Sequence, residues 1–226
     1  MSRMLIRLLV DEVLVGALLF LSAGTLEWAQ AWILLAVQFI VRTVGALLIA
    51  RANPALLRDR ANLSLHADQG PADRFLVLGV LATGFLGLPL VAGLDAFHWH
   101  ALARPSISAT MIGLILFGLG WVLKNVALWS NTFAVTGVRL QPDREHVVVD
   151  AGPYRVVRHP FYAADPLIFV GLGLWLGSYI TVLWAVVPLA LMVFRLQLEE
   201  ELLRTGLPGY AAYMERVRFR LVPGVW

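Results

Sequence analysis

The sequence predicts an all-α polytopic membrane protein with about six transmembrane helices. Three observations support this prediction: the composition, a series of long apolar segments, and the placement of the arginines between them. Of the 226 residues, 59% are hydrophobic and 15% are charged, and the mean hydropathy is +0.76. Soluble domains average about 45–50% apolar and about 25% charged residues. The composition therefore excludes a disordered chain and argues against an ordinary cytosolic enzyme, and the lack of cysteine excludes a disulfide scaffold.

Four apolar segments each have the length of a membrane crossing, for which about 20 residues suffice. They are Leu5–Leu26, Ala29–Ala50, Phe75–Phe97 and Ser108–Trp129. The first has the apolar character of a signal peptide, but no convincing small-residue cleavage site follows it and further spans come after it. Arg42 lies deep in the second segment, so we expect it to pair with an acid or to line a cavity.

A fifth apolar stretch, Pro166–Leu198, is too long for one ordinary crossing. Gly177 and Ser178 lie near its middle, which predicts two helices joined by a tight turn, an antiparallel hairpin. One long tilted helix is the alternative. We expect Asp165 to cap the first helix of the hairpin, with Pro166 at its first helical position.

The arginines cluster at the N-terminus, between the second and third spans, between the fourth and fifth, and near the C-terminus. The intervening turns, Glu27–Gln30 and Asp95–Ile107, hold only Arg104. With six spans all the arginine clusters fall on the cytoplasmic side, as the positive-inside rule requires, whereas five spans would export the last cluster. We therefore predict an integral protein of the plasma or inner membrane with both termini cytoplasmic. Its basic pI of about 9.7 then reflects the membrane surface rather than nucleic acid.

Two cytoplasmic segments carry most of the polar residues outside the spans. The loop 51–74 is expected to be a connector or an interfacial helix. The loop Asn131–Phe161 is long enough to have structure or function of its own. Because a hairpin returns the chain to the side that it left, this second loop and the tail Glu199–Trp226 should meet at the cytoplasmic mouth of the last two helices.

Closely spaced histidine, tyrosine, arginine and glutamate side chains mark these two meeting segments. In chain order they are Gly152 and Tyr154, then Arg158-His159-Pro160-Phe161-Tyr162, then Arg195 with Glu199-Glu200, and finally Gly206, Tyr210, Tyr213 and Arg220–Pro223. This order and spacing resemble the isoprenylcysteine carboxyl methyltransferase family and its relatives among the integral-membrane phospholipid methyltransferases. The resemblance covers about residues 141–226, so we divide the chain into transmembrane helices with the loop 51–74 (residues 1–130) and a catalytic methyltransferase region (residues 131–226).

The resemblance implies an enzyme that binds S-adenosylmethionine without a Rossmann domain, and no G-x-G-x-x-G sequence follows a strand pattern here. The implied cofactor-binding residues are Gln141, His146, Val147, Val148, Val149, Tyr154, His159, Pro160, Phe161, Tyr162 and Glu199. The implied substrate-binding residue is Arg195, and the implied catalytic residues are Arg195, Glu199, His159 and Tyr162. No metal site is predicted, since His98 and His100 have no evident third ligand.

Methyl transfer from a sulfonium is an in-line displacement, so such an enzyme mainly positions two partners and excludes water. Glu199 can bind an amine or a ribose, and Arg195 can hold an acidic head group bidentately. Nothing in the sequence is an obvious dedicated base, which favours an acceptor that is already anionic. The acceptor is expected to be a lipophilic molecule from the bilayer. An isoprenylcysteine-type carboxylate, a phospholipid amine and another lipid-linked acid or thiol all remain open, as does the oligomeric state.

Other functions also remain open. Membrane sterol reductases resemble this family around the C-terminal hairpin, and Arg139, Arg144 and Arg158 could supply a phosphate pocket for NADPH. A non-catalytic membrane sensor of the same fold is a further alternative. Tyr210 and Tyr213 are expected to be aromatic residues of the membrane interface. Where the family usually has a small residue and glycine after the histidine motif, this chain has Ala163-Ala164-Asp165-Pro166, and the lost glycine and the extra carboxylate can reshape the acceptor pocket.

Overall fold

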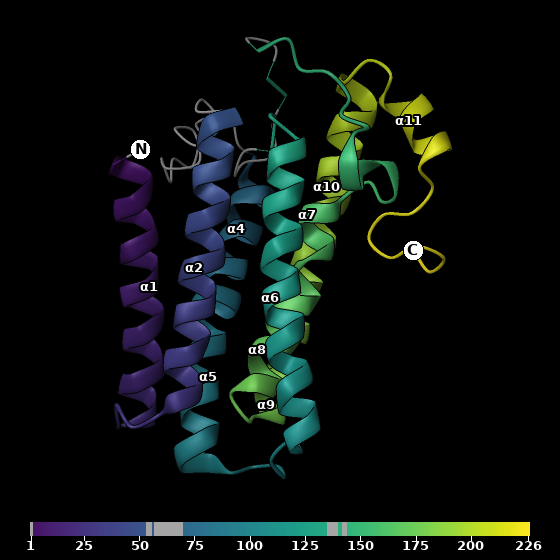
Figure 1. The fold of residues 1–226 in the computed structure, drawn as a ribbon. Helices are drawn as coiled ribbons and strands as arrows, with labels where there is room; N and C mark the ends of the chain where they lie inside the picture. Colours follow the sequence, from purple (N-terminus) through teal and green to yellow (C-terminus); the bar gives the residue numbers. More distant parts are fainter. Residues whose placement is uncertain (1, 53–55, 57–69, 135–139, 142–143) are drawn as a thin grey trace.

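The computed structural model describes residues 2–52, 56, 70–134, 140–141 and 144–226. These residues form a bundle of roughly parallel and antiparallel helices and contain no β-strand (Figure 1). The helices are α1 (Ser2–Ala23), α2 (Ala29–Ala52), α4 (Pro71–Val80), η1 (Leu81–Leu86), α5 (Gly87–Leu94), η2 (Asp95–Trp99), α6 (Ile107–Ser130), η4 (Gly152–Arg155), α7 (Pro160–Ala163), α8 (Asp165–Trp175), α9 (Tyr179–Trp184), α10 (Val186–Gly206) and α11 (Tyr210–Arg216). The expectation of an interfacial helix in the loop 51–74 falls largely on residues outside those described.

Four helical stretches of the described part are long and apolar enough to cross a membrane. They are Ala29–Arg51, Pro71–Trp99, Ile107–Ser130 and Tyr179–Gly206. The prediction of an integral membrane protein is therefore supported by the structure. The predicted number of six also counts α1, which carries Arg7, Asp11 and Glu12, and the shorter apolar stretch Pro160–Trp175; that number and the orientation in the membrane stay predictions.

Arg42 pairs with acids of the neighbouring helix, which was one of its two expected roles. Its Nη2 donates to Asp11 at 2.6 Å and its Nη1 to Glu12 at 3.4 Å. Gln38 Nε2 also donates to Glu12, at 3.0 Å. The charges within these apolar helices are thus partnered across the contact between α1 and α2, as desolvated charges require.

Glycines bring α6 and α8 into close contact. A Cβ atom on Gly171 would lie 2.5 Å from the Phe117 backbone nitrogen, and one on Gly113 would lie 2.6 Å from the Trp175 nitrogen. Small residues at such positions let two helix backbones approach within a membrane. This contact fixes α8, and with it the segment that precedes α8, against the centre of the bundle.

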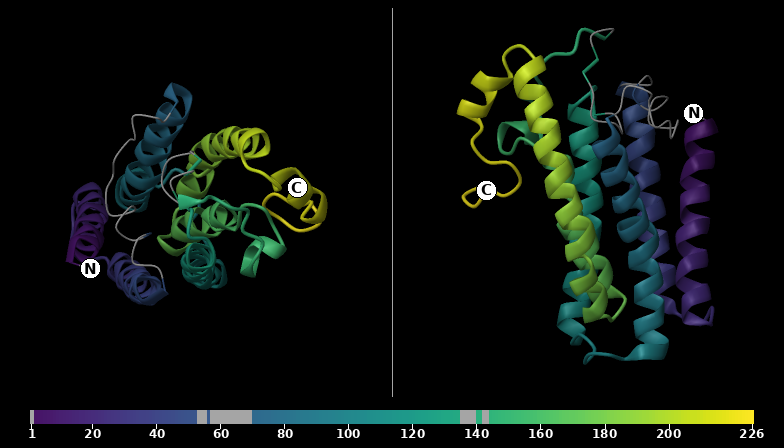
Figure 2. Two further views of the ribbon diagram at one scale, coloured as in Figure 1. Left: turned by 90° about the horizontal axis from the view of Figure 1, so that it is seen from above. Right: turned by 180° about the vertical axis from the view of Figure 1, so that it is seen from behind.

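The chain turns back between α8 and α9. Gly177 has φ of +82°, a left-handed conformation that favours glycine, and Ser178 then caps α9 by accepting from the Thr181 amide at 3.0 Å. From α9 the chain continues into α10, which packs against α4 and runs back to the end of the bundle that carries the long loop (Figure 2). Tyr162, before α8, thereby reaches Glu199, near the end of α10, at 2.6 Å.

Two expectations about helix ends were wrong. Glu199–Gly206 belong to α10 rather than to the tail, because Glu, Leu and Arg are good helix formers and the helix continues beyond its apolar part until Gly206. Asp165 does not cap α8: the preceding residue, Ala164, has helical φ and ψ of −75° and −25°, whereas a capping residue needs non-helical backbone. The Asp165 carboxylate pairs instead with Lys124 of α6, at 2.5 Å.

Candidate active site

Glu200 joins the loop before α7 to the tail after α11. Its Oε1 accepts from Arg158 Nε at 2.6 Å and lies 3.2 Å from His159 Nε2, and its Oε2 accepts from Arg220 Nε at 2.6 Å. The His159 amide also donates to the Arg220 carbonyl at 3.0 Å. The predicted meeting of loop and tail is therefore present. We call Glu200, Arg158, His159 and Arg220 the Glu200 cluster.

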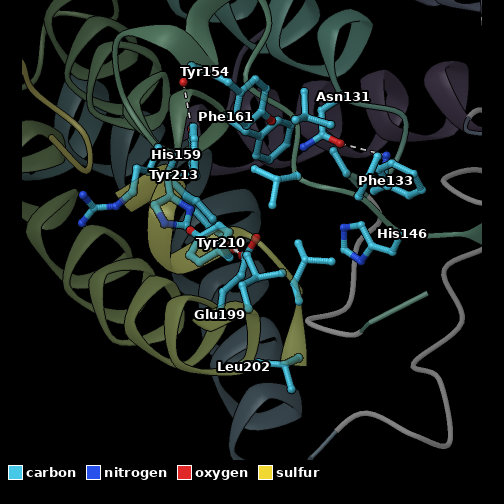
Figure 3. A pocket seen from close by; sticks show the side chains of 18 of the residues that line it. Asn131, Phe133, His146, Tyr154, His159, Phe161, Glu199, Leu202, Tyr210 and Tyr213 are labelled. Carbon is cyan, nitrogen blue, oxygen red and sulfur yellow. Dashed lines mark hydrogen bonds between the residues drawn. The ribbon is translucent and has the colours of Figure 1, made fainter. Parts of the chain in front are cut away.

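A cavity lies between this loop, the end of α10 and α11 (Figure 3). Ten of the residues implied by the resemblance line it: His146, Val147, Val148, Val149, Tyr154, His159, Phe161, Tyr162, Arg195 and Glu199. Gln141 and Pro160 are not among the lining residues. Gln141 is fully buried, and its amide donates to the Phe133 carbonyl and accepts from Arg144, both at 2.8 Å. It holds the loop that carries His146.

Tyr210 and Tyr213 line the same cavity, so their assignment to the membrane interface was wrong. They are only 4% and 1% exposed, because α11 folds back over the loop, and the Tyr213 hydroxyl donates to the Tyr154 carbonyl at 2.7 Å. Burial raises the pKa of Tyr213 to about 12 and the pKa of Tyr210 further still, so both hydroxyls remain protonated at neutral pH. Their spacing of three residues could have indicated one helix face, but not what that face covers.

A chain of polar side chains forms the inner wall of the cavity. Asp73 Oδ1 accepts from Arg195 Nε at 2.7 Å, Arg195 Nη1 donates to the Tyr162 hydroxyl at 2.6 Å, and that hydroxyl donates to Glu199 Oε2 at 2.6 Å. Arg195 is therefore held by an acid and a tyrosine of the protein itself. Asp73, on α4, was missed, because it lies 122 residues from Arg195 in the chain and outside every motif.

Two buried polar atoms at this cavity have no hydrogen-bond partner among the described residues: His146 Nδ1 and the Tyr210 hydroxyl. His146 packs against Phe133 with ring centroids 4.4 Å apart. Burial lowers the pKa of the His146 imidazole below its ordinary value; Arg144 lowers it further, and Glu199 opposes the shift. The ring is therefore neutral at neutral pH. Buried polar groups normally have partners, so both atoms point to a polar ligand.

A second, largely apolar cavity adjoins the first. We call it the apolar cavity and the first, whose lining is about half polar, the polar cavity. Residues of several helices line it, among them Leu88, Phe117 and Ile168. Phe161, Tyr162 and Arg195 line both cavities. The side chains that close the polar cavity at its inner end therefore also close the apolar one, and a ligand in either would contact them.

These features define a helical membrane protein with a polar cavity at one end of its bundle and an apolar cavity within it. Residues 108–207 match the model of the phospholipid methyltransferase family. The resemblance drawn from the motifs is thereby confirmed over that segment, which begins in α6, ahead of the motifs, and includes the hairpin and α10. The match supports a membrane methyltransferase. No curated protein matches the chain.

Proposed function

We propose that the chain is an S-adenosylmethionine-dependent methyltransferase that transfers a methyl group to a lipophilic acceptor from the bilayer. One observation carries the proposal: a polar and an apolar cavity meet at Phe161, Tyr162 and Arg195. A reaction between a water-soluble cofactor and a membrane lipid needs two such compartments with a shared wall. The acceptor remains either an isoprenylcysteine-type carboxylate or a lipid head group at this stage.

The residues of the polar cavity fit this cofactor. His146 Nδ1 and the Tyr210 hydroxyl are buried atoms that lack a partner in the described chain, and S-adenosylmethionine has an amine, a carboxylate, hydroxyls and an adenine to offer them. Glu199 can accept from the amine or the ribose, and the Tyr154 ring can face the positive charge. When bound, the cofactor supplies a methyl group on a positively charged sulfur.

The protein's own part in this mechanism is to bind, orient and exclude water. Tyr162 is fixed between Glu199 and Arg195, so the wall between the two cavities has one defined arrangement. Because Glu199 faces the polar cavity and Arg195 borders both cavities, we assign Glu199 to the cofactor and Arg195 to the head group of the acceptor. The apolar cavity keeps the lipid chain away from water. We further propose that the polar cavity opens to the cytoplasm, as the distribution of arginines predicts.

The alternative of an NADPH-dependent reductase has less support. Arg158, one of the residues offered for its phosphate, is buried and bonds to Glu200 and to the Val217 and Arg218 carbonyls. Arg144 bonds to Gln141 and the Thr132 carbonyl, and Arg139 lies outside the described residues. The family match favours methyl transfer.

Isothermal titration of the purified full chain in detergent tests the proposal. We expect S-adenosylmethionine to bind and NADPH not to bind. Glu199→Gln and His159→Ala should weaken cofactor binding by about tenfold or more, since a charge-assisted hydrogen bond contributes about 1.5–3 kcal/mol. Glu201→Gln is the matched control, because Glu201 is exposed and pairs only with Arg204 among the described residues. Binding of NADPH alone would refute the proposal, and binding of neither ligand would favour a sensor.

A further inference from the structure

The apolar cavity contains a buried carboxylate oxygen with no partner. Asp165 is 1% exposed and lines this cavity. Its Oδ1 pairs with Lys124 Nζ at 2.5 Å, whereas its Oδ2 is buried without a hydrogen-bond partner among the described residues. An ionised oxygen in an apolar cavity is costly unless a donor reaches it. A ligand in this cavity can therefore supply the hydrogen-bond donor that Asp165 Oδ2 lacks.

Trp121 adds an unmet donor to the same cavity. Its indole Nε1 is also buried without a partner in the described part of the chain, and its side chain lines the cavity with Asp165. An indole nitrogen only donates hydrogen bonds. The cavity thus offers one acceptor and one donor that the described residues leave unused, a combination that suits a group able both to donate and to accept.

These two side chains lie near the wall shared with the polar cavity. Asp165 follows Phe161 by four residues, about one helical turn, and the Lys124 ammonium lies 4.2 Å from the centroid of the Phe161 ring. Phe161 lines both cavities. A head group bound at Asp165 would therefore lie beside the place where acceptor and cofactor meet, with its hydrocarbon chain in the apolar cavity.

We propose that Asp165 selects the acceptor by accepting a hydrogen bond from its head group, which is an alcohol or an amine rather than a carboxylate. Trp121 Nε1 donates to the oxygen of an alcohol head or to the lone pair of an amine head in its neutral form, and Lys124 keeps the Asp165 carboxylate in place. A carboxylate head has no hydrogen to give Oδ2 and carries the same charge. Lys124 and Arg195, the cations that line this cavity, are already paired with Asp165 and Asp73, so this site disfavours a carboxylate. The inference rests on the proposed function, because it takes the apolar cavity as the acceptor site, and it replaces our expectation of an anionic acceptor.

Three lipids with one chain and different heads test this inference: oleyl alcohol, oleylamine and oleic acid. Binding of each tritiated lipid is measured on the full chain in detergent micelles. We expect the alcohol or the amine to bind at least about tenfold more tightly than the acid, as one hydrogen bond to a charged acceptor allows. The tighter of the two identifies which head the site takes, and label from the methyl group of S-adenosylmethionine should enter that lipid. Asp165 Oδ2 would accept the proton that the head group loses as its oxygen or nitrogen bonds to the methyl carbon and the carbon–sulfur bond breaks.

Asp165→Asn should reduce the preference over oleic acid to within about threefold, because the charge is lost and the amide offers a donor of its own. Glu201→Gln, which changes an exposed carboxylate, should leave the preference intact. If Asp165→Asn does not fold, Trp121→Phe decides instead: it keeps the ring, removes the N–H, and should weaken binding of the preferred lipid by at least about threefold.

Oleic acid binding as tightly as the other two, an unchanged preference in the folded variant, or binding of none of the three lipids would overturn the inference. Its failure is distinguishable from that of the proposed function, because Asp165 and Lys124 do not line the polar cavity. Affinity for S-adenosylmethionine, measured in the same samples, should be equal in wild type and Asp165→Asn. If the wild type does not bind S-adenosylmethionine at all, the proposed function is refuted instead.

Discussion

Replacing Glu200 with glutamine should release the tail from the rest of the protein. Glu200 accepts from Arg158 and Arg220 at 2.6 Å each and faces His159 at 3.2 Å. The side chains of Arg158 and Glu200 are only 6% and 7% exposed. Glutamine keeps the shape but removes the charge, so a buried guanidinium loses its counter-ion. Removing one partner of a buried ion pair costs about 3–5 kcal/mol.

The lower end of that range applies here, because the Arg220 side chain is 33% exposed and water can replace its partner. A loss of about 3 kcal/mol raises the population of chains with a released tail by about 100-fold. Limited trypsin digestion of the folded protein measures this population, since cleavage tracks the open state when opening and closing are fast. Arg218 is a suitable cleavage site, because its carbonyl accepts from Arg158 at 2.8 Å while the tail is in place. Cleavage after Arg218 therefore reports release of the tail.

The matched control is Glu201→Gln, which removes a neighbouring carboxylate whose ion pair is exposed, with side chains 54% and 60% accessible. Such a pair contributes about 0–1 kcal/mol, so its cleavage rate should stay near that of wild type. Of these two variants only Glu200→Gln should lose cofactor affinity, because His159 loses Glu200 and the tail residue Arg220, which hold it. If the two variants are cleaved at the same rate, the reasoning about the Glu200 cluster is refuted.

Three further predictions concern the wall, the loop and the helix contact. Arg195→Ala should abolish turnover while cofactor affinity stays within about tenfold, since Arg195 acts on the cofactor side of the wall through the Tyr162 hydroxyl and the loss of one such hydrogen bond costs about 0.5–1.5 kcal/mol; a larger loss of affinity would reassign Arg195 to the cofactor. Because burial lowers the pKa of the His146 imidazole below its ordinary value, the ring is neutral at neutral pH: cofactor affinity should be constant from about pH 8 to about pH 7 and fall at acidic pH as a positive charge enters the cavity, and His146→Phe should remove this fall. Gly171→Ala should destabilise the protein by about 1–3 kcal/mol in thermal unfolding, because a Cβ there would meet the Phe117 backbone. Gly118→Ala, which meets nothing within 4 Å, should be neutral or slightly stabilising, and equal effects of the two changes would contradict the packing argument.

The membrane class, the apolar segments and the meeting of loop and tail could be predicted from the sequence, because each follows from a periodic or compositional signal. Helix ends were harder. The apolar run ends at Leu198, but α10 continues to Gly206, since backbone hydrogen bonds and helix propensity do not stop where hydrophobicity does. The capping expected of Asp165 failed because α7 had already set a helical backbone before it. Capping rules, which use only the residues next to a helix start, do not detect a second helix that ends just before it.

The site shows the same division between local pattern and three-dimensional arrangement. Arg195 and Glu199 share a helix face by their spacing, yet in the structure they are joined through Tyr162 of α7, which precedes the other arm of the hairpin. Glu199 and Glu200 are adjacent and chemically identical, but successive helical residues point about 100° apart. Glu199 therefore lines the cavity, and Glu200 fastens loop to tail. The sequence motif contains both acids and does not distinguish them; the packing of the tail decides which one can contact a ligand. If Glu199→Gln released the tail, and Glu200→Gln weakened cofactor binding while the tail stayed in place, the arrangement as a whole would be contradicted.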